Sequence, residues 1–195
     1  MPPTTSVPAA PRKNRGPAAA AENRQALIAA AREVYAEGGL NAPFSAVAKR
    51  AGVGQGSLYR HFPDRTALAV AVFEDNVRDL EEYTAPEDRT VDDLLDRVVD
   101  QAVASTALIE LITADLTADL TDPRTARLAE RFTALVATLV ERDRASGRIG
   151  DHIDVTDVAL ASSMLATELA RAEPAMRPEI ARRVLALFRA AFAPR

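Results

Sequence analysis

Polar side chains that can read DNA bases lie close together between residues 55 and 60. Glutamine and arginine can each make two hydrogen bonds to one base edge, and Gln55 and Arg60 flank Ser57 in this segment. Gln55 also fits a second interpretation, as an ordinary solvated residue at the start of a helix. We expect Gln55, Ser57 and Arg60 to face the bases of a DNA duplex.

Donors suited to the DNA backbone stand next to these residues. The Tyr59 hydroxyl, the His61 ring and the Arg65 guanidinium can give hydrogen bonds or positive charge to phosphate oxygens. Tyr59 also fits a core aromatic residue whose hydroxyl reaches the surface. A lone histidine makes no metal site, and the chain has no cysteine. We therefore expect phosphate contacts from these three residues, and neither a metal nor a cofactor.

Two short helices joined by a glycine-containing turn must position these side chains. The apolar spacing predicts a helix from about 44 to 51 and another over 55–61, which Pro63 brings to an end. This order is the helix-turn-helix arrangement, in which the second helix can lie in the DNA major groove. The segment therefore predicts a DNA-recognition element.

Four residues of this element have the sizes that two crossing helices require. Ala48 is small enough for a close crossing, and Gly52 can adopt the positive φ of a tight turn. Val53 and Leu58 are apolar where they would fill the space between the helices. We expect these four residues to form the turn and the core of the element.

The segment before the element divides into an arm and a helix. Residues 1–21 contain five prolines and no apolar periodicity, so we expect a flexible arm there. Its basic residues Arg12, Lys13 and Arg15 could be solubilising charge or could contact the minor groove or phosphates. Helical spacing begins near Glu22 and stops at Gly38, a usual C-terminal signal.

A long linking helix is expected after the element. Asp64 is a candidate N-cap for this helix, which we place at 64–84. The polar, proline-containing stretch that follows it suggests a boundary between a head and a body. We assign the DNA-binding domain to residues 22–66 and an effector-binding and dimerisation domain to residues 67–195.

The remainder of the chain has the pattern of an all-helical body. Several segments beyond residue 90 carry helical apolar spacing, with breaks at 122–123, 146–154 and 173–174. No alternating apolar pattern of useful length indicates a strand. The sequence predicts an all-α fold of about nine helices, with a three-helix head and a helical C-terminal domain.

Composition and charge agree with a DNA-binding head on an acidic body. Net charge is −4, but residues 1–65 hold nine Lys and Arg against four acids, and the remainder holds fifteen against twenty-four. Chance scatter of surface charge would explain this difference equally simply. No run of about eighteen apolar residues could span a membrane. We expect a soluble, cytoplasmic protein without membrane contact.

The helix-turn-helix segment resembles the TetR family of bacterial transcriptional repressors. The resemblance is carried by Val47-Ala48, Ala51-Gly52-Val53, the run from Gly56 to Phe62, Arg65 and Leu68. It implies an all-α homodimer with a three-helix DNA-binding head on about the first quarter of the chain. It also implies a C-terminal domain that binds a small-molecule inducer. Family roles fall on Tyr59, His61 and Arg65 as phosphate contacts, and on Gln55 and Ser57 in the recognition helix.

Three positions depart from the family pattern. Ala42-Pro43 replaces the Ser or Thr that often caps the second helix, so Asn41 is left as a possible cap. Gly54 replaces a common Ser or Thr in the turn, and Arg65 replaces the more usual Lys while keeping its charge. These departures leave the expected fold unchanged but make the operator sequence harder to predict.

The last two predicted helices have the pattern of a dimer interface. Small residues allow close helix approach in one helix, and the other carries a wide apolar stripe. Both helices could also simply pack within one subunit. By this pattern and by the resemblance, we assign the homodimer interface to Ala159, Ser163, Ala166, Val184, Leu187 and Phe188.

A ligand pocket is expected among the helices of residues 91–170. Pockets combine an apolar lining with a few convergent polar groups. Each polar residue there also fits a solvated surface or an ordinary core position. The candidate ligand contacts are Thr106, Glu110, Thr113, Met164 and Glu168.

The combined prediction is a ligand-responsive, sequence-specific transcriptional regulator. We expect it to bind a palindromic double-stranded operator as a dimer and to be released by a small-molecule effector. Activation in place of repression stays open. The first alternative is a helical protein-interaction adaptor without DNA binding. An all-α enzyme that uses carboxylates is the less favoured alternative. Acidic residues at 92, 93, 96 and 100 could serve such an enzyme, but a solvated helix face explains them better.

Overall fold

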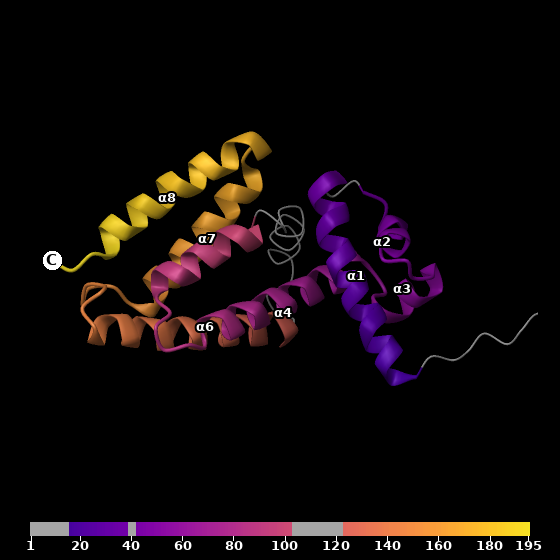
Figure 1. The fold of residues 1–195 in the computed structure, drawn as a ribbon, viewed down its shortest axis with the longest axis horizontal. Helices are drawn as coiled ribbons and strands as arrows, with labels where there is room; N and C mark the ends of the chain where they lie inside the picture. The colour runs from indigo at the N-terminus through magenta and orange to yellow at the C-terminus, as the bar shows by residue number, and fades with distance from the viewer. Residues whose placement is uncertain (1–15, 39–41, 103–122) are drawn as a thin grey trace, which may run out of the picture.

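The computed structural model describes residues 16–38, 42–102 and 123–195. This part of the chain is built of helices and contains no β-strand, so the all-α prediction is confirmed. Helices α1 to α3 form a head, α4 leads out of it, and the later helices form a body (Figure 1). None of the described helices is long and apolar enough to cross a membrane.

Helix α1 (Pro17–Gly38) begins five residues before the expected start at Glu22. Proline is tolerated in the first turn of a helix, and the four alanines that follow it are the strongest helix formers. The end of the expected arm is therefore helical from residue 17 onward, while residues 1–15 lie outside the described part. The inner face of α1 is apolar, with Leu27 and Ile28 fully buried.

Helices α2 (Phe44–Arg50) and α3 (Gln55–His61) form the predicted helix-turn-helix. Ala48 and Leu58 are buried at the crossing, and Val53 packs against the same core. Gly52 has a φ of 65°, the positive value that the tight turn was expected to need. Pro43 and Gly54 are the N-cap residues of α2 and α3, and neither helix receives a side-chain cap. The possible cap at Asn41 lies outside the described residues.

Helix α4 (Arg65–Thr84) connects the head to the body. The Asp64 carboxylate accepts a hydrogen bond from the Ala67 backbone nitrogen at 2.7 Å, which confirms the predicted N-cap. Leu68 lies in the head core and Leu80 in the body core, while Phe73 packs against both. The assigned domain boundary after residue 66 thus falls at the start of a helix that belongs to both cores.

The body consists of a helix over residues 91–102, α6 (Pro123–Ala145), α7 (Val155–Arg171) and α8 (Arg177–Phe192). A short 3-10 helix, η2 (Pro174–Met176), joins α7 to α8 at the predicted break. The body core contains fully buried leucines from three of these helices: Leu94, Leu95, Leu139, Leu165 and Leu169.

Asp143, near the end of α6, links three segments at one end of the body through hydrogen bonds. Its side chain is almost completely buried and accepts a hydrogen bond from the Val91 backbone nitrogen at 2.8 Å. Its other oxygen accepts one from Arg148 Nε at 2.8 Å. Asp143 therefore satisfies a backbone donor at the start of the helix over 91–102, and it ties this helix to α6 and to the loop after it.

Candidate nucleic-acid interface

The outer face of α3 presents the residues that were expected to contact bases. Leu58 is completely buried on the inner face of the helix, whereas Gln55 and Arg60 are exposed and Ser57 is half-buried. Arg60 Nη2 donates a hydrogen bond to Ser57 Oγ at 3.1 Å, which holds the guanidinium along the outer surface of the helix. The structure thus brings Gln55, Ser57 and Arg60 onto one accessible stretch of α3.

Tyr59 lies at the contact between α3 and α2 and is also open to solvent. Its ring packs edge-on against Phe44 of α2, with ring centroids 5.5 Å apart. The residue nevertheless remains 53% exposed. The ring therefore braces α3 against α2 while part of the side chain stays open to a bound molecule.

His61 is more enclosed than a simple phosphate donor would be. It is half-buried, and its Nε2 atom is buried without a hydrogen-bond partner among the described residues. Burial lowers the pKa of His61, and the positive charges of Arg60 and Arg24 lower it further. These effects favour the neutral ring in the protein without DNA.

Arg65 opens α4 at the edge of the head. It is half-buried, and its positive charge opposes the rise in the pKa of Tyr35 that burial causes. This electrostatic effect places Arg65 within range of Tyr35 on α1. The residue therefore opens α4 near the α1 residue Tyr35.

Two arginine contacts that hold the head together were missed by sequence reasoning. Arg50 of α2 pairs with Glu33 and Glu37 of α1, at 2.8 and 2.7 Å. Arg24 of α1 lies over the Phe62 ring, with its guanidinium carbon 5.4 Å from the ring centroid. The spacing of Glu33 and Glu37, one helical turn apart, was the available signal for the first contact.

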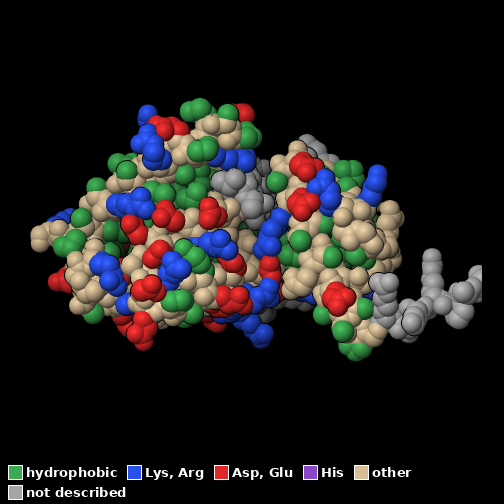
Figure 2. All heavy atoms as spheres, viewed as in Figure 1, with side chains coloured by type: hydrophobic (Ala, Val, Ile, Leu, Met, Phe, Trp, Pro, Cys, Tyr) green, Lys and Arg blue, Asp and Glu red, His purple; other side chains and the backbone are tan. Residues whose placement is uncertain are grey.

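The surface of the body carries charges of both signs. Figure 2 shows acidic and basic side chains interspersed over the body. No group of three or more metal-ligating side chains occurs within the described ranges. Among these residues, the exposed face of α3 and its surroundings are the part of the head whose chemistry fits nucleic acid.

These features define the class of a helix-turn-helix DNA-binding protein. The family model described as "Bacterial regulatory proteins, tetR family" matches residues 27–72, which span α2, α3 and parts of α1 and α4. The match thus covers the recognition element together with the two helices that support it.

Solved structures of TetR regulators resemble the whole chain. One from Streptomyces coelicolor is 26% identical, with a TM-score of 0.66 over 88% of this chain and 98% of that one. One from Mycobacterium vanbaalenii is 25% identical, with a TM-score of 0.64 over 90% and 98%. A putative TetR-family regulator from Rhodococcus, 20% identical, shares the fold with a TM-score of 0.63 over 89% and 100%. A search of curated proteins finds no match.

Residues 27–72 match the TetR family model, and the chain as a whole is similar to solved TetR regulators. It is a DNA-binding transcriptional regulator and not an enzyme, as the resemblance implied.

A cavity of about 410 Å³ lies in the body, between α4, the helix over 91–102, α6 and α7. Three of the expected ligand contacts, Thr106, Glu110 and Thr113, fall outside the described residues. The other two, Met164 and Glu168, are not among the residues that line this cavity. They line a separate groove of about 590 Å³ between α7 and α8.

Five of the six residues assigned to the dimer interface line one or both of these hollows. Val184 and Phe188 of α8 line the α7–α8 groove, and Leu187 is 69% exposed. Ala159 and Ala166 of α7 line the interior cavity. Ser163 lies between the two faces of α7 and lines both hollows.

Proposed function

We propose that the protein is a dimeric repressor that binds a palindromic operator through α3 and is released by a small molecule. The observation that carries this proposal is the two-sided character of α3, which buries Leu58 and exposes Gln55 and Arg60. A helix held in this way can enter the major groove without disturbing the core beneath it. Gln55, Ser57 and Arg60 are the proposed base contacts.

Phosphate contacts are proposed for three residues around α3. Tyr59 offers an exposed hydroxyl-bearing ring, His61 a neutral imidazole, and Arg65 a guanidinium at the start of α4. Such contacts fix the position of a protein on the duplex without reading its sequence. Ala48, Gly52, Val53 and Leu58 hold α3 in place and make no contact with DNA in this proposal.

The dimer is proposed to form through the outer faces of α7 and α8. Leu160, Met164 and Leu187 are 58, 54 and 69% exposed there, and they are among the few large apolar side chains left in solvent. Burying such a side chain contributes about 1.5–3 kcal/mol. A two-fold axis through this face would pair two α3 helices, as a palindromic site requires.

The effector is proposed to bind in the interior cavity. Its volume lies within the range of small-molecule sites, and α4 forms one of its walls. Because α4 also enters the head core, a ligand that favours one position of α4 would favour one position of the head. Release of DNA then requires that the ligand bind the non-operator conformation more tightly.

Selection of duplexes from a random pool tests the DNA-binding part of this proposal. We expect the purified protein to recover a palindrome, with affinity that falls steeply between about 50 and 200 mM salt. Placing the recovered palindrome over a promoter should lower transcription of a reporter in the presence of the protein. Recovery of no consensus and no binding of bulk DNA at low salt would refute the proposal. Stimulation of the reporter would refute repression but not DNA binding.

A further inference from the structure

The interior cavity has a neutral lining. None of the residues that line it among those described is Asp, Glu, Lys, Arg or His. Most of the lining is apolar, with Phe73, Val98 and Phe132 from three different helices. The cavity opens to solvent along α6, where Ala129 and Thr133 are exposed. An ionised group placed in it would lose hydration without gaining a partner charge, at a large cost in free energy.

The polar end of the cavity is formed by Asn76 of α4 and Gln101 of the helix over 91–102. Gln101 Nε2 donates to the Asn76 backbone oxygen at 3.0 Å and to Asp79 Oδ2 at 2.8 Å. Both amide hydrogens of Gln101 are thus used, which leaves its side-chain oxygen as an acceptor. Asn76 Oδ1 accepts a hydrogen bond from Arg32, which leaves the Asn76 amide nitrogen as a donor. One acceptor beside one donor matches a hydroxyl or an amide group.

Asn76 and Gln101 separate the cavity from a second pocket that includes a residue of the head. Asn76 and Gln101 also line a smaller polar pocket of about 250 Å³ that contains Arg32 of α1. Arg32 Nη2 donates to Asn76 Oδ1 at 2.7 Å and to Asp75 Oδ2 at 2.8 Å. Asn76 is only 7% exposed, so its side chain has few ways to reorient without breaking the bond to Arg32. A molecule bonded to Asn76 from the cavity side therefore acts on a residue of the DNA-binding head.

We propose that the cavity takes an uncharged, largely apolar molecule bearing a hydroxyl or amide group, and that Asn76 transmits its binding to the head through Arg32. This inference rests on the proposed function, since it assigns the effector class and its transmission to that site. The ligand's polar group bonds to the Asn76 amide nitrogen and the Gln101 side-chain oxygen, and its apolar part packs against the phenylalanines. The Asn76 side chain shifts toward the ligand, and this shift lengthens and weakens its hydrogen bond to Arg32. Loss of that bond removes one of the contacts between α1 and α4 and favours the conformation that leaves DNA.

A series of ligands that share one chain tests the chemical class. Decanol, decanoate and decylammonium are titrated into the full-length protein by calorimetry, without DNA. We expect decanol to bind, and the two ions to bind at least about 10-fold more weakly. Ala129→Phe, at the cavity opening, should weaken decanol binding. Ala134→Phe, at an exposed site of α6 that does not line the cavity, should not. Equal binding of an ion, no binding of decanol, or equal effects of the two variants would overturn the ligand class.

A pair of α1 variants tests the transmission. Arg32→Met removes the bonds to Asn76 and Asp75, while Arg24→Met removes the α1–α4 contact to Glu74 at 3.4 Å and the contact with the Phe62 ring. Decanol should weaken duplex binding by the wild type and by Arg24→Met about 10-fold. For Arg32→Met we expect a change of less than about 2-fold, although decanol still binds. A full response in Arg32→Met, or no response in the wild type, would overturn the transmission.

The calorimetric result is independent of DNA binding. A chain that binds decanol but no duplex would confirm the ligand class and refute the proposed function. A chain that binds its palindrome but not decanol would refute the ligand class and leave the regulator intact.

Discussion

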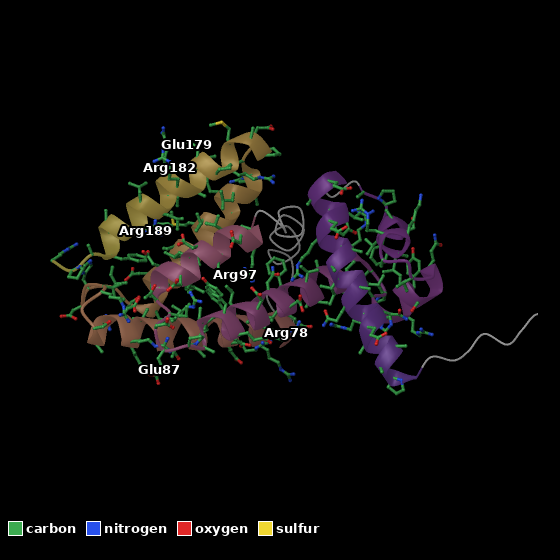
Figure 3. The ribbon with its side chains drawn as sticks, viewed as in Figure 1. Arg78, Glu87, Arg97, Glu179, Arg182 and Arg189 are labelled. Carbon is green, nitrogen blue, oxygen red and sulfur yellow. The ribbon has the colours of Figure 1, made fainter. Side chains whose placement is uncertain are left out.

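Arg97 and Asp79 form a two-point ion pair between the helix over 91–102 and α4. Arg97 Nε donates to Asp79 Oδ2 at 2.8 Å, and Arg97 Nη2 donates to Asp79 Oδ1 at 2.6 Å. Figure 3 shows Arg97 extending from its helix toward α4. The pair lies directly beside Gln101, which also donates to Asp79. It therefore fixes the first body helix to the helix that enters the head.

This pair gives stability a defined dependence on pH. The hydrogen bond from Arg97 holds the pKa of Asp79 below its usual value, although burial opposes this effect. The folded state therefore favours the ionised carboxylate. The resulting stabilisation is complete above the unfolded pKa of about 3.9 and is lost as pH falls through the lower folded pKa.

Asp79→Asn should destabilise the protein by about 0.5–1 kcal/mol at neutral pH, because the carboxylate is partly exposed and screened by solvent. The difference from the wild type should shrink as pH falls below about 4. Urea unfolding at several pH values measures this difference in the free energy of unfolding. Asp100→Asn is the control, since Asp100 lies 3.9 Å from Arg97 and its side chain is 72% exposed. An Asp79→Asn difference that grew toward acid pH would contradict the assignment.

Removing the buried carboxylate of Asp143 should destabilise the protein more than Asp79→Asn does. Asp143→Ala leaves the buried Val91 backbone nitrogen without an acceptor, and we expect a loss of about 2–3 kcal/mol. Asp143→Asn keeps one oxygen for Val91 and should lose less than the alanine variant. Thermal unfolding of both variants tests this order, and equal losses would show that the hydrogen bond to Val91 contributes little.

The two groups of α3 contacts should differ in their effect on sequence preference. Tyr59→Phe removes one phosphate donor and should weaken binding to all duplexes alike, by about 5-fold. Gln55→Ala should instead lower the discrimination between bases at one position, by about 1–3 kcal/mol. Repeating the duplex selection with each variant measures both effects. Altered base preference in Tyr59→Phe would show that its assignment to the backbone is wrong.

A charge on the outer face of α8 should disrupt the proposed dimer. Leu187→Glu places an ionised group among exposed apolar side chains, so we expect a monomer with weaker operator binding. Met176→Glu is the control for an added charge, because Met176 is 52% exposed but lies in η2, outside α7 and α8. Sedimentation of both variants at micromolar concentration reports the state of association. A dimeric Leu187→Glu protein would place the interface elsewhere.

The local features of the head could be predicted from the sequence. The bounds of α3 agree at both ends, because Gly54 and Pro63 interrupt the chain on either side of it. The cap at Asp64 and the positive φ of Gly52 also depend only on neighbouring residues. The helix α1 starts earlier than the prolines of the arm suggest, because the four alanines after Pro17 favour a helix.

Features that depend on packing between distant segments could not be predicted in this way. Small residues at 159 and 166 share α7 with Leu160 and Met164, and the sequence does not say which face meets α4 and α6. The structure turns the small residues toward the cavity and leaves the larger ones exposed. The bond from Arg32 to Asn76 joins residues 44 positions apart, and no local pattern indicates such a contact.

The most direct test of operator binding by a dimer compares the recovered palindrome with a duplex that carries only one of its half-sites. Sedimentation and fluorescence anisotropy, applied to the same labelled duplexes, give the number of chains bound and the affinity. We expect two chains on the palindrome, and binding to the single half-site weaker by at least about 100-fold, because each α3 then loses its partner. Equal affinity for both duplexes, with one chain bound to each, would contradict it.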